Sequence, residues 1–507
     1  MIISQMLLAL LSAGLLAAPF LDPRLFLIAW FSFVPLFWTV KHARSWRWAT
    51  FYGWIMGTAA HLIGFYWLVY TISAFGGFPY GVSVIVFIIY AALQGIEGAL
   101  LALFIRTGGW GPVCLFPPMF WVAIEFLFPL LFPWHVANSQ VGFSWFIQSA
   151  DLVGPYGASF VVLWFNAAVY KFVSTRRLAE PGTSLPLACS TLAIILSLVY
   201  GFERLRTVEQ EMAGAPKLAT GAVQGNVDID LKWDPTLAQR NLDRHRRITD
   251  SLDSPALVIW PESAIEFMVP ENLPVLPPEF MPSFKSPQSY FIFGAKSFSG
   301  ILGRPGMKAF NTAFFTDARG RILARYHKQV LLAFGEYLPF SKILSLVPGI
   351  PFADGFTPGQ GPIAFQLSPN IRVAPLICYE DLMPDLARKF VSETHANLLV
   401  NLTNDAWYGR SVGPWQHLAL ARSRAIETRR TLLRVTNTGV TSLVNAKGEV
   451  VQTLPMFTTA AMPAEVDILN DETYYVRFGD WFAWGMTIVS ALVLLLSMRS
   501  STRRRAE

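Results

Sequence analysis

Long runs of hydrophobic residues dominate the first two-fifths of the chain. Seven of these runs have about the length that a helix needs to cross a bilayer, and an eighth stands alone near the C-terminus. They occupy residues 3–20, 25–40, 51–73, 80–105, 110–133, 157–174, 185–203 and 478–498. The pattern predicts an α-helical membrane bundle of about eight transmembrane helices.

A different pattern begins after the seventh run. Short apolar segments of strand length alternate with amphipathic stretches of helical length, separated by turn signals. The strand candidates are 218–224, 256–260, 290–298, 371–378, 396–402 and 432–436, and the helical ones are 237–252 and 414–430. We therefore expect a membrane domain of seven helices over 1–204, a water-exposed α/β domain over 205–475, and a C-terminal transmembrane helix with a basic tail over 476–507.

Charge supports this division. Of all 507 residues 15% are charged, against about 25% in an average soluble domain. Residues 1–204 hold only six of the 34 acidic and nine of the 40 basic residues. The net charge of +6 does not indicate a nucleic-acid partner, because the basic residues are not gathered into a stripe.

Basic residues in the short loops predict the orientation. They follow the even-numbered runs, as Lys41, Arg44, Arg47, Arg106, Lys171, Arg176, Arg177, Arg499, Arg503, Arg504 and Arg505. The loops after odd-numbered runs hold only Arg24. Because positively charged loops stay in the cytoplasm, both termini are expected inside and residues 205–475 outside.

Three segments of the predicted α/β domain share one format, in which a buried strand ends in a reactive polar residue. They are Trp260-Pro261-Glu262, Tyr326-His327-Lys328 and Ile377-Cys378-Tyr379-Glu380, the last running into a predicted helix. A cysteine thiolate suits covalent acyl transfer, a glutamate can take the thiol proton, and a lysine can stabilise an oxyanion. A cysteine on a buried strand is by itself more often a core residue, but the three together favour catalysis.

The order Glu262, Lys328, Cys378 resembles the Glu-Lys-Cys triad of the carbon–nitrogen hydrolase (nitrilase) superfamily. The flanking hydrophobic runs resemble its membrane-bound branch, the apolipoprotein N-acyltransferases. Further matching elements are Phe75–Pro79, Gln224-Gly225-Asn226, Lys232-Trp233, Asn311-Thr312, Phe334–Pro339 and Asn401–Trp407. This resemblance implies an αββα sandwich for the α/β domain.

It also implies a reaction. An acyl chain of a membrane phospholipid, phosphatidylethanolamine in particular, is carried on Cys378 as a thioester and passed to the α-amino group of a diacylated bacterial apolipoprotein. Glu262 is then the general base and Lys328 the oxyanion donor. Supporting or substrate-binding roles fall to Glu336, Trp233, Asn311, Tyr379 and Glu380. No cofactor and no metal are expected. The implied location is the bacterial inner membrane, with the catalytic domain on the periplasmic side.

Two alternatives to this function stay open. In a membrane-tethered amidase, water would resolve the thioester; in an inert scaffold, the triad would have no role. A second open point concerns residues 267–284, which are rich in proline and aromatic residues. They are either an arm that touches lipid or a surface loop whose apolar side chains fold inward.

Overall fold

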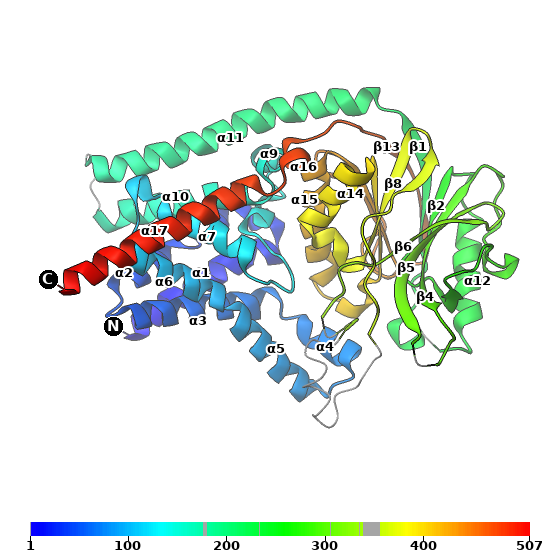
Figure 1. Ribbon diagram of the computed structural model, residues 1–507, viewed down its shortest axis with the longest axis horizontal. Coiled ribbons are helices and arrows are strands. Elements are labelled where there is room, and N and C mark those ends of the chain that lie inside the picture. Colours follow the sequence, from blue (N-terminus) through cyan, green and yellow to red (C-terminus); the bar gives the residue numbers. More distant parts are fainter. Residues whose placement is uncertain are drawn as a thin grey trace. The chain divides into compact units, whose positions relative to one another are not determined.

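The computed structural model describes residues 2–175, 180–232, 234–304, 306–333, 335–337 and 355–506 (Figure 1). Its contacts divide the chain into two compact units. One comprises Met1–Ile72, Pro79–Arg206 and Phe478–Glu507, and the other comprises Ser73–Phe78 and Thr207–Arg477. The short segment Ser73–Phe78 therefore belongs with the second unit, although its neighbours on both sides belong to the first.

The first unit is a bundle of hydrophobic helices, with two helices that continue into the second. Its elements are α1 (Ile2–Leu21), η1 (Pro23–Phe31), α2 (Val34–His42), α3 (Trp46–Gly64), α4 (Leu68–Gly76), α5 (Tyr80–Gln94), α6 (Ile96–Gly108), η2 (Pro112–Cys114), α7 (Phe116–Leu127), η3 (Val136–Gln140), α8 (Ser144–Ile147), α9 (Ala150–Val153), α10 (Tyr156–Thr175), α11 (Pro181–Gly214) and α17 (Trp481–Ala506). Small residues let α3 and α6 approach closely, since a Cβ on Gly53 would lie 2.2 Å from the carbonyl oxygen of Gly98.

Six helices in the described part of the chain are long and apolar enough to cross a membrane, and the bent pair α3–α4 gives a seventh. The predicted run 110–133 contains only the shorter apolar helix Pro112–Leu127. Prolines explain the difference. Pro117 and Pro118 stand at the start of α7, and the chain turns extended at Phe128, before Pro129, because a residue that precedes proline disfavours helix. The membrane bundle is confirmed, with six or seven candidate spans by length and composition where about eight were predicted.

The second unit contains two β-sheets. The strands are β1 (Lys217–Gln224), β2 (Leu257–Ile259), β3 (Ile265–Pro270), β4 (Tyr290–Ser299), β5 (Lys308–Asp317), β6 (Ile322–His327), β7 (Phe365–Ser368), β8 (Ile371–Ile377), β9 (Leu398–Thr403), β10 (Thr431–Thr436), β11 (Ser442–Val444), β12 (Val450–Thr453) and β13 (Ala460–Asp467). One sheet runs β13-β1-β2-β4-β5-β6 with β3 beside β4, and the other runs β12-β11-β10-β9-β8-β7.

Helices cover the outer faces of both sheets. The helices are α12 (Ala238–Thr249), α14 (Pro384–Thr394), α15 (Gly413–Thr428) and α16 (Tyr474–Phe478), and the short 3₁₀ turns are η4 (Ile229–Leu231), η5 (Pro278–Phe280), η6 (Cys378–Leu382) and η7 (Asp405–Tyr408). Figure 1 shows α12 outside the first sheet and α14 and α15 outside the second. One apolar core joins residues of both sheets, such as Ile259, Phe315 and Val400. The αββα sandwich is therefore confirmed.

Each predicted strand overlaps an observed one. Strand β9 is buried along its whole length, as parallel strands covered on both faces must be. Residues 267–284 fold inward: Leu276 and Met281 are buried, and Phe267, Phe280 and Phe284 pack against the same core. The structure thus favours the reading of this segment as a surface loop.

Candidate active site

Three strand ends bring the predicted catalytic residues into one place. Glu262 follows β2, Lys328 follows β6 and Cys378 follows β8. Glu262 and Lys328 are buried, and Cys378 is half-buried. The charges of Glu262 and Lys328 both act on the thiol of Cys378. The two sheets therefore contribute the three groups to a single site.

Asn311, on β5, connects two carboxylates of this site. Its side-chain amide donates to Oε1 of Glu262 at 2.8 Å and to Oε1 of Glu336 at 2.9 Å. The other oxygen of Glu336 lies 2.7 Å from Nζ of Lys328 and accepts a hydrogen bond from the backbone N–H of Leu332 at 2.9 Å. A continuous polar chain thus runs from Glu262 through Asn311 and Glu336 to Lys328.

Burial and neighbouring charges set the protonation of this chain. Burial lowers the pKa of Lys328, but Glu336, Cys378 and Glu262 together raise it above its ordinary value, so the ammonium form is favoured. Burial raises the pKa of Glu262, with Lys328 opposing and Glu336 adding to the rise. A carboxylate with a raised pKa is a better proton acceptor at neutral pH.

The protonated thiol is the favoured form of Cys378 at rest. Burial raises its pKa, and Glu262 adds to the rise while Lys328 opposes it. Instead of beginning a long helix, Cys378 opens the five-residue 3₁₀ turn η6, and α14 starts only at Pro384. The reactive thiolate must therefore come from proton transfer to a neighbouring base, and Glu262 is the candidate.

The backbone at Cys378 is left-handed, with a φ of 53°. A residue with a side chain is destabilised there by about 1–2 kcal/mol, and such strain persists only where the surrounding structure enforces it. Asn401 supplies one constraint, because its side-chain amide donates to the carbonyl oxygen of Cys378 at 2.9 Å. The turn thus ends strand β8 one residue before its predicted end.

Glu380 lies behind the catalytic groups and is fully buried. One of its oxygens accepts from the hydroxyl of Tyr326 at 2.9 Å and from the backbone N–H of Gln329 and Val330 at 2.7 and 3.1 Å. The other accepts from the N–H of Ile377 at 2.8 Å. Burial raises the pKa of Glu380 to about 7, opposed by these N–H groups and by the charge of Lys328.

Two further lysines act on Glu262. Nζ of Lys232 lies 3.4 Å from the carbonyl oxygen of Glu262; burial lowers the pKa of Lys232 to about 8, opposed by Glu266 and Glu262. Burial also lowers the pKa of the half-buried Lys296, opposed by Glu262. The sequence analysis gave Lys232 no role of its own and missed Lys296, whose signal is a lysine inside an otherwise apolar strand.

Not every predicted site residue can be placed. Tyr379 is buried beside the triad, and burial raises its pKa while Lys328 opposes the rise. Trp233 lies outside the described residues, as do Phe334, Leu338 and Pro339 of the matched motif around Glu336. The predicted supporting residues that the structure describes, Glu336, Asn311, Tyr379 and Glu380, all neighbour the triad.

A buried charge cluster adjoins η6. His417 lies 2.8 Å from Oδ1 of Asp381 through Nε2 and 2.8 Å from Oδ1 of Asp405 through Nδ1. Arg434 donates to the other oxygen of Asp381 at 2.9 Å. Because ionised carboxylates only accept hydrogen bonds, this arrangement favours the imidazolium form of His417, in which both ring nitrogens donate. The sequence analysis missed this cluster, although Arg434 within the apolar strand β10 is a signal for it.

The segment Ser73–Phe78 contacts motif residues of its own unit. The ring of Phe75 lies 4.0 Å, centroid to centroid, from that of Trp407. A Cβ on Gly335 would approach the Phe75 ring to 3.0 Å, and Gly335 directly precedes Glu336. Three separate sequence motifs therefore meet beside the polar chain.

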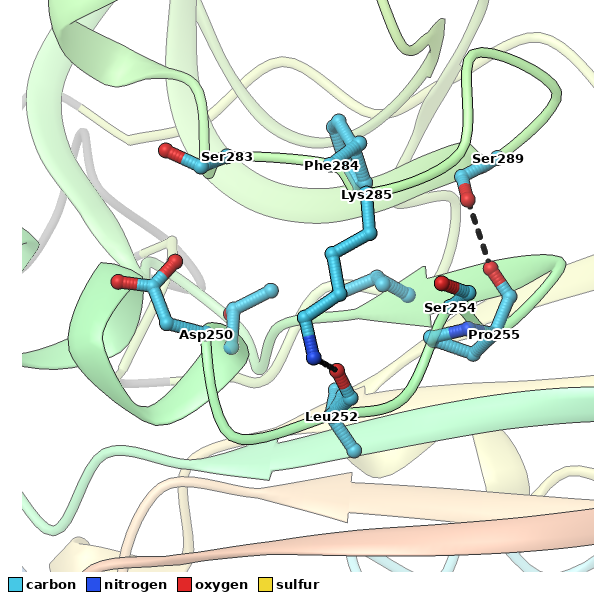
Figure 2. Close-up of a pocket in the computed structure, with 10 residues that line it drawn as sticks. Asp250, Leu252, Ser254, Pro255, Ser283, Phe284, Lys285 and Ser289 are labelled. Carbon is cyan, nitrogen blue, oxygen red and sulfur yellow. Dashed lines mark hydrogen bonds between the residues drawn. The ribbon is translucent and has the colours of Figure 1, made fainter.

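The second unit also contains a cavity of about 190 Å³, and none of the site residues described above lines it. Figure 2 shows two hydrogen bonds between residues that line this cavity. Nζ of Lys285 donates to the carbonyl oxygen of Leu252 at 3.0 Å, and the hydroxyl of Ser289 donates to the carbonyl oxygen of Pro255 at 2.8 Å. These two side chains are therefore engaged in local structure.

Known proteins resemble both parts of the chain. The apolipoprotein N-acyltransferase N-terminal domain matches residues 12–168, and the carbon-nitrogen hydrolase domain matches residues 256–470. An apolipoprotein N-acyltransferase of Geobacter metallireducens is 32% identical over 506 residues, covering 97% of this chain and 95% of the relative. That of Rickettsia bellii is 30% identical and covers 94% of each chain. The crystal structure of an amidase from Nesterenkonia sp. is 19% identical, with a TM-score of 0.34, over 51% of this chain and 92% of that one.

Proposed function

This chain belongs to the apolipoprotein N-acyltransferase family, and from that premise we propose that it acylates the N-terminal diacylglyceryl-cysteine of bacterial lipoproteins with a chain taken from a membrane phospholipid. The observation that supports this most is the polar chain Glu262–Asn311–Glu336–Lys328 beside the protonated thiol of Cys378. It supplies a base and a cation around one nucleophile.

In the first half-reaction, Glu262 takes the proton from Sγ of Cys378, and the thiolate attacks the ester carbonyl carbon of the phospholipid. Lys328, held by Glu336 at 2.7 Å, stabilises the oxyanion. The ester C–O bond then breaks, and the lysophospholipid leaves with the proton that Glu262 had taken. The acyl chain remains on Cys378 as a thioester.

In the second half-reaction, the α-amino group of the apolipoprotein attacks the thioester carbonyl, and Glu262 accepts a proton from the amine. Lys328 again faces the oxyanion. The C–S bond breaks, the amide is released, and the sulfur of Cys378 regains its proton from Glu262. Each half-reaction therefore returns Glu262 to its starting ionisation, as a ping-pong scheme requires.

The membrane location suits both substrates, which are held in lipid. The loop charges place the α/β unit on the extracytoplasmic side, which in a bacterial inner membrane is the periplasmic side. Phosphatidylethanolamine is the proposed donor. Residues 1–204 and 476–507 are the proposed membrane parts, and 205–475 the catalytic domain.

The test separates the two half-reactions. Purified protein incubated with phosphatidylethanolamine vesicles should gain the mass of one acyl chain, and the Cys378→Ala variant should gain none. A diacylated lipopeptide with a free α-amino group should then discharge the acyl-enzyme and yield an amide, whereas the N-acetylated peptide should leave it in place.

The competing candidate is the tethered amidase, in which water resolves the thioester. It becomes the better account if the acyl-enzyme decays at the same rate with the free-amine and the N-acetylated peptide. With both substrates varied, the transferase should show parallel double-reciprocal lines.

A further inference from the structure

The helical unit contains a cavity that plays no part in the proposed acyl transfer. Its volume is about 470 Å³, within the roughly 300–1,000 Å³ of small-molecule sites. The C-terminal ends of α2 and α10, the start of α11 and the loop between α6 and α7 enclose it. By the loop charges, these helix ends lie on the cytoplasmic side, whereas Cys378 is proposed on the other side.

Basic side chains line this cavity. Lys41 and His42 come from α2, and Lys171 comes from α10. Lys171 is half-buried, and neither lysine has an ion-pair partner among the residues that the structure describes. The ring of His42 is fixed by Nδ1, which lies 2.8 Å from the carbonyl oxygen of Trp38. The cavity is therefore positively charged and no carboxylate of the described residues lines it.

The remaining walls are aromatic and aliphatic. Trp110 stacks on Tyr170 with ring centroids 4.7 Å apart, and Phe37 packs edge-on against Trp110 at 5.3 Å. Leu185 and Pro186 of α11 add aliphatic surface. Cations beside rigid apolar walls fit an amphiphile with an anionic head better than they fit a free anion.

The loop that closes the cavity holds a strained conformation. Val113 and Cys114 both have left-handed backbones, with φ of 45° and 60°, which is a genuine outlier for a β-branched valine. The indole N–H of Trp164 donates to the carbonyl of Val113 at 2.8 Å and so holds the loop. Backbone strain of this kind gathers at binding sites.

We propose that this cavity binds the phosphate headgroup of an anionic membrane phospholipid such as phosphatidylglycerol. The phosphate lies between Lys41 and Lys171, and the start of the acyl chains lies along Leu185 and Pro186. Basic pockets between transmembrane helices on the cytoplasmic side bind such headgroups. This lipid is a bound component of the membrane part and differs from the acyl donor, which must meet Cys378.

The test measures lipid retention by native mass spectrometry of the full-length protein in detergent, with phosphatidylglycerol or phosphatidylethanolamine added. The wild type should retain one phosphatidylglycerol in preference to phosphatidylethanolamine. The double variant Lys41→Gln/Lys171→Gln should retain at least about five-fold less. Acyl transfer should stay near wild type, because neither lysine belongs to the catalytic site; this also shows that the variant is folded.

The matched control is Arg44→Gln/Arg106→Gln, which removes the same charge from exposed positions outside the cavity and should leave retention unchanged. Equal loss in both double variants, or equal retention of the two lipids by the wild type, would overturn the proposal. A third arm adds inorganic phosphate. Displacement of the lipid by millimolar phosphate would reassign the cavity to a free anion.

Discussion

Glu380 accepts a hydrogen bond from the backbone N–H of Gln329 at 2.7 Å. Gln329 directly follows Lys328, and Glu380 comes two residues after Cys378, so this bond joins the segments that carry two of the proposed catalytic groups. The same carboxylate accepts the N–H of Ile377 at the end of β8. We therefore propose Glu380 as a positioning residue that sets the separation of the lysine and the cysteine.

Replacing Glu380 by glutamine should reduce kcat by about 100-fold or more while changing KM little. A glutamine places its NH₂ group against a backbone N–H, and an unsatisfied buried donor costs about 1–3 kcal/mol. The control is Glu393→Gln, which changes an exposed glutamate of the neighbouring helix α14. A kcat above about a third of the wild-type value, measured as lipopeptide acylation, would show that Glu380 is not needed for this positioning.

Lys328→Arg should lose about 10²–10³ in rate, the effect of removing one oxyanion donor, with folding intact. The ammonium is buried and held 2.7 Å from Glu336, and a wider guanidinium cannot occupy the same point. Lys217 offers a matched control, because it also pairs with a carboxylate, that of Asp467 at 3.1 Å, but is exposed. If Lys328→Arg is as active as Lys217→Arg, the oxyanion role is wrongly assigned.

The charge cluster around His417 should make stability depend on pH. Burial lowers the pKa of His417, but Asp381 and Asp405 raise it above its ordinary value; this stabilisation is complete below about pH 6.5 and is lost as the pH rises through the folded-state value. Burial raises the pKa of Asp381, but His417 and Arg434 hold it below its ordinary value, so a second loss occurs only in strong acid.

Thermal unfolding in detergent from pH 5.5 to 9 can measure this dependence. The variant His417→Gln should be less stable by about 3–5 kcal/mol at pH 6, since it removes a buried cation that two buried carboxylates share, and its stability should vary less with pH. His395→Asn, which removes an exposed histidine, should keep the wild-type slope. Parallel pH curves for wild type and His417→Gln would mean that the imidazolium is absent.

Reporter fusions can test the predicted orientation. A reporter after Gln210 should be extracytoplasmic and one after Arg503 cytoplasmic, because basic loops follow the even-numbered hydrophobic runs. The number of membrane spans depends on whether the shorter apolar helix Pro112–Leu127 crosses the membrane. Opposite signals from both fusions would reverse the assignment, and matching signals at the two sites would mean that one segment does not cross.

The sequence was sufficient for the elements that rest on local patterns. The strands that end before Glu262 and Cys378 were visible because apolar runs of strand length stop at a turn or a polar residue. The resemblance added the supporting carboxylates, and the structure then brought Glu336 to 2.7 Å from Lys328. The sandwich followed from the same information.

The sequence did not predict contacts between residues that lie far apart along the chain. His417, Asp405 and Arg434 lie on three different elements, so no spacing along the chain relates them. Only the packing of α15 against β10 and η7 brings them together. The contact of Phe75 with Trp407 likewise joins residues far apart in the chain. The length of the apolar run 110–133 predicted a full span, because hydropathy does not register that prolines end helices.

At position 378 the proposed chemistry requires a cysteine, whereas the left-handed backbone favours a residue without a side chain. Glycine adopts this backbone without the steric penalty of a side chain, so Cys378→Gly should stabilise the turn by on the order of 1 kcal/mol while removing the nucleophile. A difference of that size can raise the abundance of a protein in cells. A protein that made no use of the thiol would therefore be more stable with glycine at this position.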